Sequence, residues 1–231
     1  MAHDRTPPSP SSNENSRRHA AEGCPAPGEE RDRGIETVPR QAATVILLRG
    51  GDRVLEVLLV QRTPLATFMG GAWVFPGGAV DASEGEGDAA HRAAAVRELA
   101  EEAHVRLADP RRLIKYSQWI TPPQVKIRYD THFFLAELPE GQHPRVDGQE
   151  CVDLRWAAPA DALSAQRSGE LELVFPTIKH LEQLDAFASV RALLDHARGR
   201  AVTPVTPHVV GSGETARVVL PGEPGYARAA T

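Results

Sequence analysis

Two stretches carry the most information in this chain: Phe75-Pro76-Gly77-Gly78, and Ala95-Val96-Arg97-Glu98-Leu99-Ala100-Glu101-Glu102-Ala103-His104-Val105. Apolar residues in the second stretch recur three and four positions apart, which is the spacing of a helix with one buried side. This spacing predicts a helix from about Ala89 to Ala103, with Asp88 as its N-cap. Four residues form the predicted buried stripe, namely Ala95, Val96, Leu99 and Ala103.

The same helix carries three glutamates, Glu98, Glu101 and Glu102, on another face, because residues three and four apart are neighbours on a helix. Alone, such a triplet is typical of a solvated, charged helix face. The glycine-rich strand end upstream and the adjacent Arg97 favour a different interpretation. Clustered carboxylates suit Mg²⁺, which neutralises diphosphate oxygens and lowers the pKa of attacking water. We therefore expect phosphoryl chemistry at this helix.

The remaining pattern mixes strands and helices without regular strand–helix–strand alternation, which predicts an α+β layered domain. Predicted strands cover Ala42–Leu48, Val54–Val60, Trp73–Phe75, Leu113–Ile120, Arg128–Ala136, Cys151–Trp156 and Ala216–Leu220. The first two should form a hairpin, Pro76-Gly77-Gly78 should stop the third, and Ser83–Gly87 should be a loop. Further helices are predicted at Pro159–Ser168 and Thr177–Ala197.

Composition limits the possible classes of function. The chain has 231 residues, of which 41% are hydrophobic and 25% charged, as in a globular domain. Its formal net charge of −5 argues against nucleic acid and anionic lipid as partners. Residues 1–40 are predicted to be a disordered leader, 41–200 the domain, and 201–231 an irregular C-terminal extension. Because no apolar run suits a signal peptide or a membrane span, we expect a cytoplasmic protein.

Taken together, the glycine turn and the glutamate helix resemble the signature box of the Nudix hydrolases. That box reads glycine, five residues, glutamate, seven residues, then Arg-Glu-apolar-x-Glu-Glu-x-Gly-apolar. The resemblance extends from about Ala42 to the predicted helix Thr177–Ala197. The flanks, including Leu58-Leu59-Val60-Gln61-Arg62 and Trp119-Ile120-Thr121-Pro122, are similar to the branch that includes the peroxisomal coenzyme A diphosphatases.

The resemblance implies a Nudix sandwich (α/β/α), in which a mixed β-sheet lies between helices. It also implies a diphosphatase that hydrolyses a nucleoside diphosphate linked to another group, with coenzyme A or acyl-CoA as first candidates. Glu98, Glu101 and Glu102 would be the ligands of Mg²⁺, with Mn²⁺ as an alternative metal. Arg97 would orient a glutamate by ion pairing. Gly77 and Gly78 would line the phosphate pocket.

Two features depart from the family pattern. Arg97 follows Gly78 by five residues more than the family spacing, so either Glu84 or Ala89 aligns with the first glutamate of the box. Glu84 or Glu86 could reach the site from this inserted loop. His104 replaces the glycine that suits a left-handed helix end, which implies a local loss of stability rather than of catalysis.

Other candidates are weaker. Arg62 and Arg128 could each bind a phosphate through a bidentate guanidinium, or could form structural ion pairs. Glu150 could add a carboxylate near the metal, or be an ordinary surface residue. Nudix proteins often dimerise, so the resemblance is also compatible with a homodimer.

Two other classes of function remain open. A Nudix domain that binds nucleotides with little turnover would serve as a regulatory module, which the inserted loop and His104 favour. A hydrolase acting on RNA ends is disfavoured, because the sequence lacks a basic stripe.

Overall fold

The computed structural model describes residues 37–66, 69–211 and 217–226. Most of the predicted leader, residues 1–36, lies outside these ranges. The strands are β1 (Arg40–Arg49), β2 (Glu56–Arg62), β3 (Trp73–Val74), β4 (Gly77–Ala79), β5 (Ile114–Ile120), β6 (Tyr129–Glu137), β7 (Cys151–Ala157), β8 (His208–Val210) and β9 (Arg217–Val219). The helices are α2 (Gly87–Ala103), α3 (Pro159–Ser168), α4 (Phe175–Leu184) and α5 (Val190–Ala197), with short 3₁₀ helices η1 (Ala82–Glu84) and η2 (Pro110–Arg112).

Strand β1 is the central strand of a mixed sheet. It pairs in parallel with β6 along its length, and antiparallel with β2 at its C-terminal end, which confirms the predicted hairpin. Near its N-terminal end it pairs antiparallel with β4, where Ala43 lies opposite Gly78 and Thr44 opposite Gly77. Strand β5 extends the sheet beyond β6, and β7 pairs with β2. The pairing thus carries Gly77 and Gly78 into the centre of the sheet.

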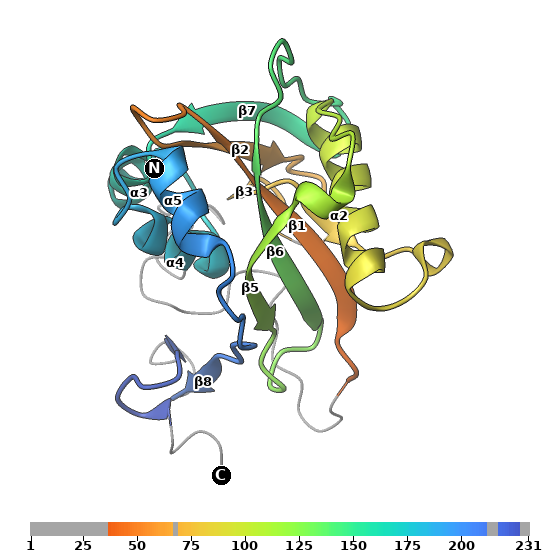
Figure 1. Ribbon diagram of the computed structural model, residues 1–231. Coiled ribbons are helices and arrows are strands. Elements are labelled where there is room, and N and C mark those ends of the chain that lie inside the picture. The colour runs from red at the N-terminus through yellow and green to blue at the C-terminus, as the bar shows by residue number, and fades with distance from the viewer. Residues whose placement is uncertain (1–36, 67–68, 212–216, 227–231) are drawn as a thin grey trace, which may run out of the picture.

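Helices cover both faces of this sheet (Figure 1), so the predicted α/β/α layering is confirmed. Alternate residues of β1 point to opposite faces, and both sets are buried. One set, which includes Val45 and Leu47, packs with Leu99 of α2. The other set, Ile46 and Leu48, packs against α3, α4 and α5. A strand buried on both sides explains why its sequence is an unbroken apolar run.

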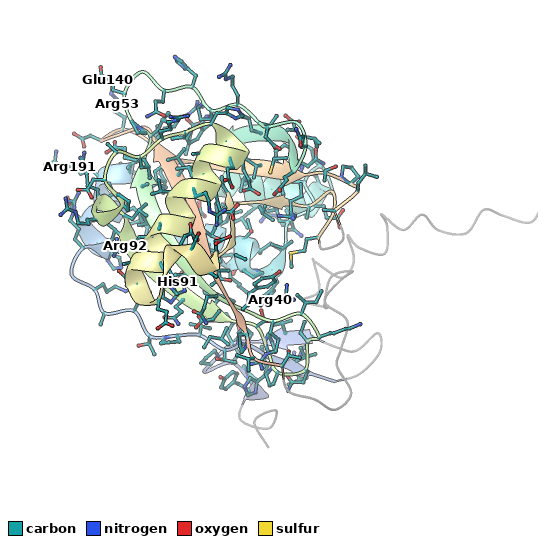
Figure 2. The ribbon with its side chains drawn as sticks, turned by 90° about the vertical axis from the view of Figure 1, so that its right-hand side faces the viewer. Arg40, Arg53, His91, Arg92, Glu140 and Arg191 are labelled. Atoms are coloured by element: carbon teal, nitrogen blue, oxygen red, sulfur yellow. The ribbon has the colours of Figure 1, made fainter. Side chains whose placement is uncertain are left out.

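The first half of α2, which carries His91 and Arg92 (Figure 2), is tied to neighbouring segments of the chain. The His91 ring stacks on the His132 ring of β6, with their centroids 3.7 Å apart, and its Nε2 lies 2.9 Å from Oε1 of Gln41 in β1. Arg92 donates to the carbonyl oxygen of Leu113 at 2.6 Å. These contacts fix the position of the helix, and therefore the position of the glutamates in its second half.

Three sequence predictions near the site are corrected. Helix α2 begins at Gly87 with Glu86 at the N-cap position, and Asp88 lies in its first turn, where a negative charge suits the helix dipole. The Ser83–Gly87 loop contains part of η1, because Asp81 and Glu84 form a reciprocal capping box around that turn. Strand β3 ends before Pro76-Gly77-Gly78, as predicted, but the two glycines are part of a strand themselves, since Gly77 starts β4.

The predicted helix Thr177–Ala197 is two helices. Pro176 lies in the first turn of α4, which begins at Phe175, and α4 ends at Leu184. The Ser189 side chain then accepts from the Ala192 backbone N–H and starts α5. The cap interrupts an apolar spacing that otherwise suits one continuous helix.

The C-terminal extension contains a hairpin, β8–β9. Strand β9 falls within the predicted strand Ala216–Leu220, whose first residue lies outside the described ranges, whereas β8 was not predicted. Across the three described ranges, every helix is too short or too polar to traverse a lipid bilayer.

A buried histidine makes the stability of this fold depend on pH. His180 of α4 is fully buried; its Nδ1–H donates to the Pro176 carbonyl at 2.6 Å, and the Ser117 hydroxyl donates to its Nε2 at 2.6 Å. Burial lowers the pKa of His180 from 6.5 to about 4. The unfolded chain therefore binds this proton first, so stability falls as the pH drops below 6.5.

We expect the wild type to lose about 2 kcal/mol more unfolding free energy than His180→Gln between pH 7.5 and pH 5. Urea unfolding at the two pH values measures this difference. His143→Gln, which changes an exposed histidine, is the control and should keep the wild-type pH dependence. Equal pH dependence in wild type and His180→Gln would contradict the assignment.

Candidate active site

A cavity of about 380 Å³ opens above the N-terminal half of β1, between β4, β6 and the start of α4. Its lining combines acidic, hydroxyl and glycine groups with apolar walls. The polar and glycine residues are Thr44, Arg62, Gly77, Gly78, Glu98, Glu102, Thr121, Tyr129, Thr131, Glu150 and Thr177. Five of the eight residues predicted for the site line this cavity, and Arg97 contacts one of these five, Glu98. Glu101 and Arg128 do not line it and are discussed below.

Glu98 and Glu102 lie one helical turn apart and both point from α2 toward β4. They are buried, with exposed fractions of 8% and 2%, which the prediction of a surface glutamate face did not anticipate. One Glu102 oxygen, Oε2, accepts from the Gly77 backbone N–H at 2.8 Å. A Cβ on Gly78 would lie 2.3 Å from Oε1 of Glu98, so glycine is needed for this close approach.

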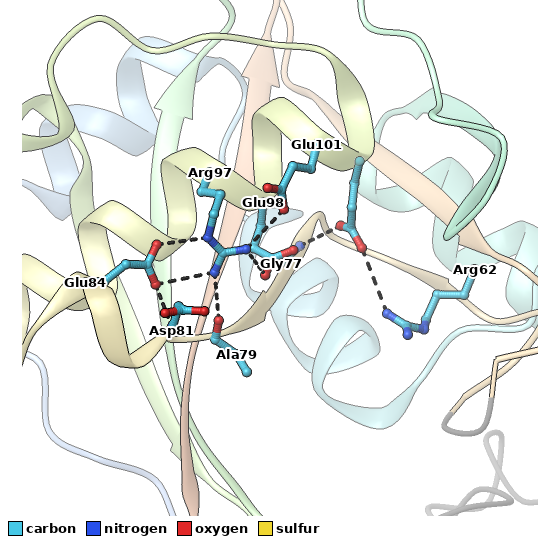
Figure 3. A network of polar contacts seen from close by, with 9 residues as sticks. Arg62, Gly77, Ala79, Asp81, Glu84, Arg97, Glu98 and Glu101 are labelled. Atoms are coloured by element: carbon cyan, nitrogen blue, oxygen red, sulfur yellow. Dashed lines mark hydrogen bonds and ion pairs between the residues drawn. The ribbon is translucent and has the colours of Figure 1, made fainter.

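The Arg97 side chain contacts three carboxylates on and beside α2 (Figure 3). Its guanidinium donates to Glu84 at 3.0 Å, to Glu98 at 2.7 Å and to Glu101 at 3.1 Å. It also donates to the Ala79 carbonyl of β4 at 2.9 Å. The hydrogen bond that Arg97 donates to Glu84, followed by those that it donates to Glu98 and Glu101, raises the pKa of Arg97 well above its usual range. Arg97 therefore stays charged and connects the inserted loop, α2 and β4.

The inserted loop reaches the site through Glu84. Both carboxylate oxygens of Glu84 contact the Arg97 guanidinium, at 3.0 and 3.3 Å. The Glu84 side chain also accepts from the Asp81 backbone N–H at 2.7 Å, which holds the loop in a tight turn. Glu86, the other candidate, instead lies at the N-cap position of α2.

Burial weakens the acidity of Glu98 and Glu102, the two buried glutamates of the cavity. Burial raises the pKa of Glu102 to about 7, and the neighbouring Glu98 charge adds to this, against the opposing effect of the Gly77 N–H. Burial likewise raises the pKa of Glu98, despite its bond to Arg97. Two carboxylates held together away from water are short of positive charge, and a bound cation would supply it.

The buried pair Glu98 and Glu102 offers the carboxylate oxygens that a hard divalent cation prefers, and Glu150 lines the same cavity. The predicted convergence of three helix glutamates is, however, not present. In the described part of the chain, no three acidic, histidine or cysteine side chains are grouped closely enough to hold a metal ion. Glu101 is mostly exposed and contacts Arg97 outside the cavity. Arg97 thus separates Glu101 from the buried pair.

The two arginines predicted to bind phosphate have different positions. Arg62 lines the cavity, with its Nη1 4.0 Å from Oε1 of Glu102. Arg128 does not line it, so a phosphate-binding role for Arg128 is not supported. It is buried, and its guanidinium donates to the backbone carbonyls of Thr121 and Thr37. Arg128 therefore holds the connection between β5 and β6, which forms one side of the cavity.

Other expectations concern residues around the site. His104 adopts the left-handed conformation predicted for the family glycine, with φ of 54°, and its Nδ1 lies 2.9 Å from the Arg145 carbonyl oxygen. Sequence reasoning missed Tyr129 and Thr131 as lining residues. Their alternation along β6 is the signal that could have found them.

Comparison with known proteins agrees with this geometry. A NUDIX domain profile matches residues 38–176, and the chain belongs to the NUDIX family. The crystal structure of a NUDIX hydrolase from Alicyclobacillus acidocaldarius aligns with a TM-score of 0.62 and 28% identity, covering 70% of this chain and 97% of that one.

Two curated relatives are more distant or partial matches. Human acyl-coenzyme A diphosphatase NUDT19 is 34% identical over 92 residues, which is 39% of this chain and 24% of the human protein. Putative nudix hydrolase 7 of Caenorhabditis elegans is 27% identical over 183 residues, covering 63% of this chain and 60% of that protein. The chain therefore spans less than two thirds of the length of either relative.

The two glycines of β4 should respond differently to an added methyl group. A Cβ on Gly77 would lie 2.5 Å from the Ala43 backbone oxygen, inside the sheet, whereas a Cβ on Gly78 would meet the far end of the Glu98 side chain. We expect Gly77→Ala to destabilise the fold by about 2 kcal/mol. Gly78→Ala should cost less stability, because a side chain moves more readily than a sheet backbone. Urea unfolding of both variants measures the difference, and an equal or larger loss for Gly78→Ala would refute it.

Proposed function

We propose that this chain is a Mg²⁺-dependent hydrolase that cleaves a phosphoanhydride bond in a nucleoside diphosphate linked to another group. The observation that carries the proposal is the buried pair Glu98 and Glu102, which lines one cavity with the Gly77–Gly78 strand. Membership of the NUDIX family supports the class of reaction. The catalytic unit in this proposal is the domain 41–200.

In this proposal each residue has a separate task. Glu98 and Glu102 would hold Mg²⁺, or Mn²⁺, with Glu150 as an additional carboxylate on the same cavity. The bound metal would neutralise the diphosphate and lower the pKa of the attacking water. Arg62 would bind a phosphate oxygen, since its guanidinium faces the same cavity. Arg97 is a positioning residue that orients Glu98, and Glu101 is assigned to Arg97, which it contacts.

Coenzyme A and acyl-CoA are the first substrates that we propose. The support is the name of the human relative, whose match covers 92 residues, together with the similar flanks of the glutamate helix. Nucleotides linked to sugars or to a second nucleoside should be tested beside them, because the cavity residues would contact the diphosphate rather than the group attached to it.

The proposal also keeps three expectations from the sequence. The partner is a small nucleotide-type molecule rather than nucleic acid, the site of action is the cytoplasm, and a homodimer is the oligomeric state to test. The net charge of −5 is consistent with the first of these.

Glu98→Gln and Glu102→Gln should each lower kcat/KM at least about 100-fold on the preferred substrate, because each change removes a charge that the metal needs. A panel of CoA, acyl-CoA, NADH, ADP-ribose, dinucleoside polyphosphates and nucleotide sugars, assayed with Mg²⁺ by released products, identifies that substrate. Glu182→Gln, which changes a glutamate of α4 paired with Lys179, is the matched control and should keep wild-type activity.

A second function, that of a module which binds nucleotides with little turnover, would be favoured by one outcome of the substrate panel. A nucleotide-binding module is motivated by the absence of a three-carboxylate group in the described ranges. Tight nucleotide binding with no product from any member of the panel would support the module and reject the hydrolase. Wild-type turnover by both Gln variants would instead remove the assigned mechanism.

A further inference from the structure

A second, smaller cavity of about 80 Å³ adjoins the one that contains the glutamates. The two cavities share four lining residues, Thr121, Thr131, Phe133 and Pro176. Thr131 and Phe133 lie on the same face of β6 as Tyr129, so this face forms a floor that continues from one cavity into the other. A ligand in the larger cavity can therefore extend into the smaller one along β6.

The walls of the smaller cavity are apolar. The domain contributes Trp119, Ile120 and Phe175, and the β8–β9 hairpin contributes Val209 and Val218. None of the residues that line this cavity carries a charge. Its two hydroxyl groups belong to Thr121 and Thr131, which are shared with the larger cavity, so the polar groups lie where the two cavities meet.

The hairpin is held against the domain by backbone pairing. The Val205 N–H donates to the Gln118 carbonyl, and its carbonyl accepts from the Ile120 N–H, both at 2.8 Å, so this residue extends the free edge of β5. The Tyr226 hydroxyl donates to the Thr206 carbonyl at 2.9 Å. Figure 1 shows β8 beyond the ends of β5 and α4. The β8–β9 hairpin lies outside residues 38–176, the part of the chain that the NUDIX family model matches.

We propose that the smaller cavity is a specificity subsite for an uncharged aliphatic group attached to the diphosphate. The inference rests on the proposed function, because it assumes that the diphosphate occupies the larger cavity. The volume gives room for roughly six water-sized groups, at about 10–15 Å³ each. A charged group, or a nucleobase edge with several donors and acceptors, would leave polar atoms unpaired against these walls.

The test uses adenosine diphosphate esters that differ only in a methyl, butyl or hexyl group on the terminal phosphate. Hydrolysis adds water across the P–O–P bridge and releases AMP and the alkyl phosphate, so kcat/KM is measured from AMP. Dissociation constants come from calorimetry with the α,β-methylene analogues, whose bridging carbon cannot be hydrolysed. Each buried methylene is worth about fourfold in binding, so the butyl compound should bind at least tenfold more tightly than the methyl compound.

Val209→Phe should fill the subsite and remove this preference, while the methyl ester keeps its wild-type values within about twofold. Val209→Ala should enlarge the subsite and move the preference toward hexyl, which tests the same claim in a variant with no added bulk. The control is Val38→Phe, which adds the same ring at a position that is 89% exposed and outside both cavities. It should keep the wild-type preference.

The outcomes separate the two proposals. Hydrolysis or binding that does not depend on alkyl length in the wild type overturns the subsite and leaves the proposed function standing. Binding that does depend on length, and is altered by the Val209 variants, supports the subsite even if no ester is hydrolysed, in which case the proposed function fails alone. Absence of binding by every analogue overturns both.

Discussion

The contact between α2 and β4 is the constraint on which the site depends. It places two carboxylates, Glu98 and Glu102, against the backbone of Gly77 and Gly78, with no space for a side chain on Gly78. Burying acidic groups is unfavourable unless hydrogen bonds or a cation compensate them. The Gly77 N–H and the Arg97 guanidinium provide part of that compensation. The remaining need for positive charge is what makes this contact a candidate metal site.

Strand pairing within the sheet holds β4, and therefore its contact with α2, in place. Strand β1 pairs with β2 at one end and with β4 at the other, so the glycine strand is built into the sheet rather than carried on a loop. Arg97 adds a second restraint by joining Glu84 of the inserted loop to the Ala79 carbonyl of β4. The insertion therefore lengthens the chain between glycine and helix without displacing the acidic pair from the strand. A rigid support of this kind favours a defined catalytic geometry.

The sequence predicted the layers and most of the elements because their patterns are local. Apolar runs and helical spacing identify β1, β2 and α2, and the (i, i+4) relation correctly put Glu98 and Glu102 side by side. Their burial was not predictable, because it depends on the pairing of β4 with β1. The position of Arg128 outside the cavity was not predictable for a similar reason: an arginine at the start of a strand looks the same whether it binds a phosphate or two backbone carbonyls. The hairpin β8–β9 was half missed, since three-residue strands give little periodicity.

The most direct test of the central claim is the binding of Mn²⁺, followed by the electron paramagnetic resonance signal of the free ion. If Glu98 and Glu102 are the divalent site, the folded wild type binds the ion, and Glu102→Gln weakens binding at least tenfold, whereas Glu170→Gln, on a surface ion pair with Arg155, leaves it unchanged. Equal affinity in all three proteins would contradict the claim that the buried pair holds the metal.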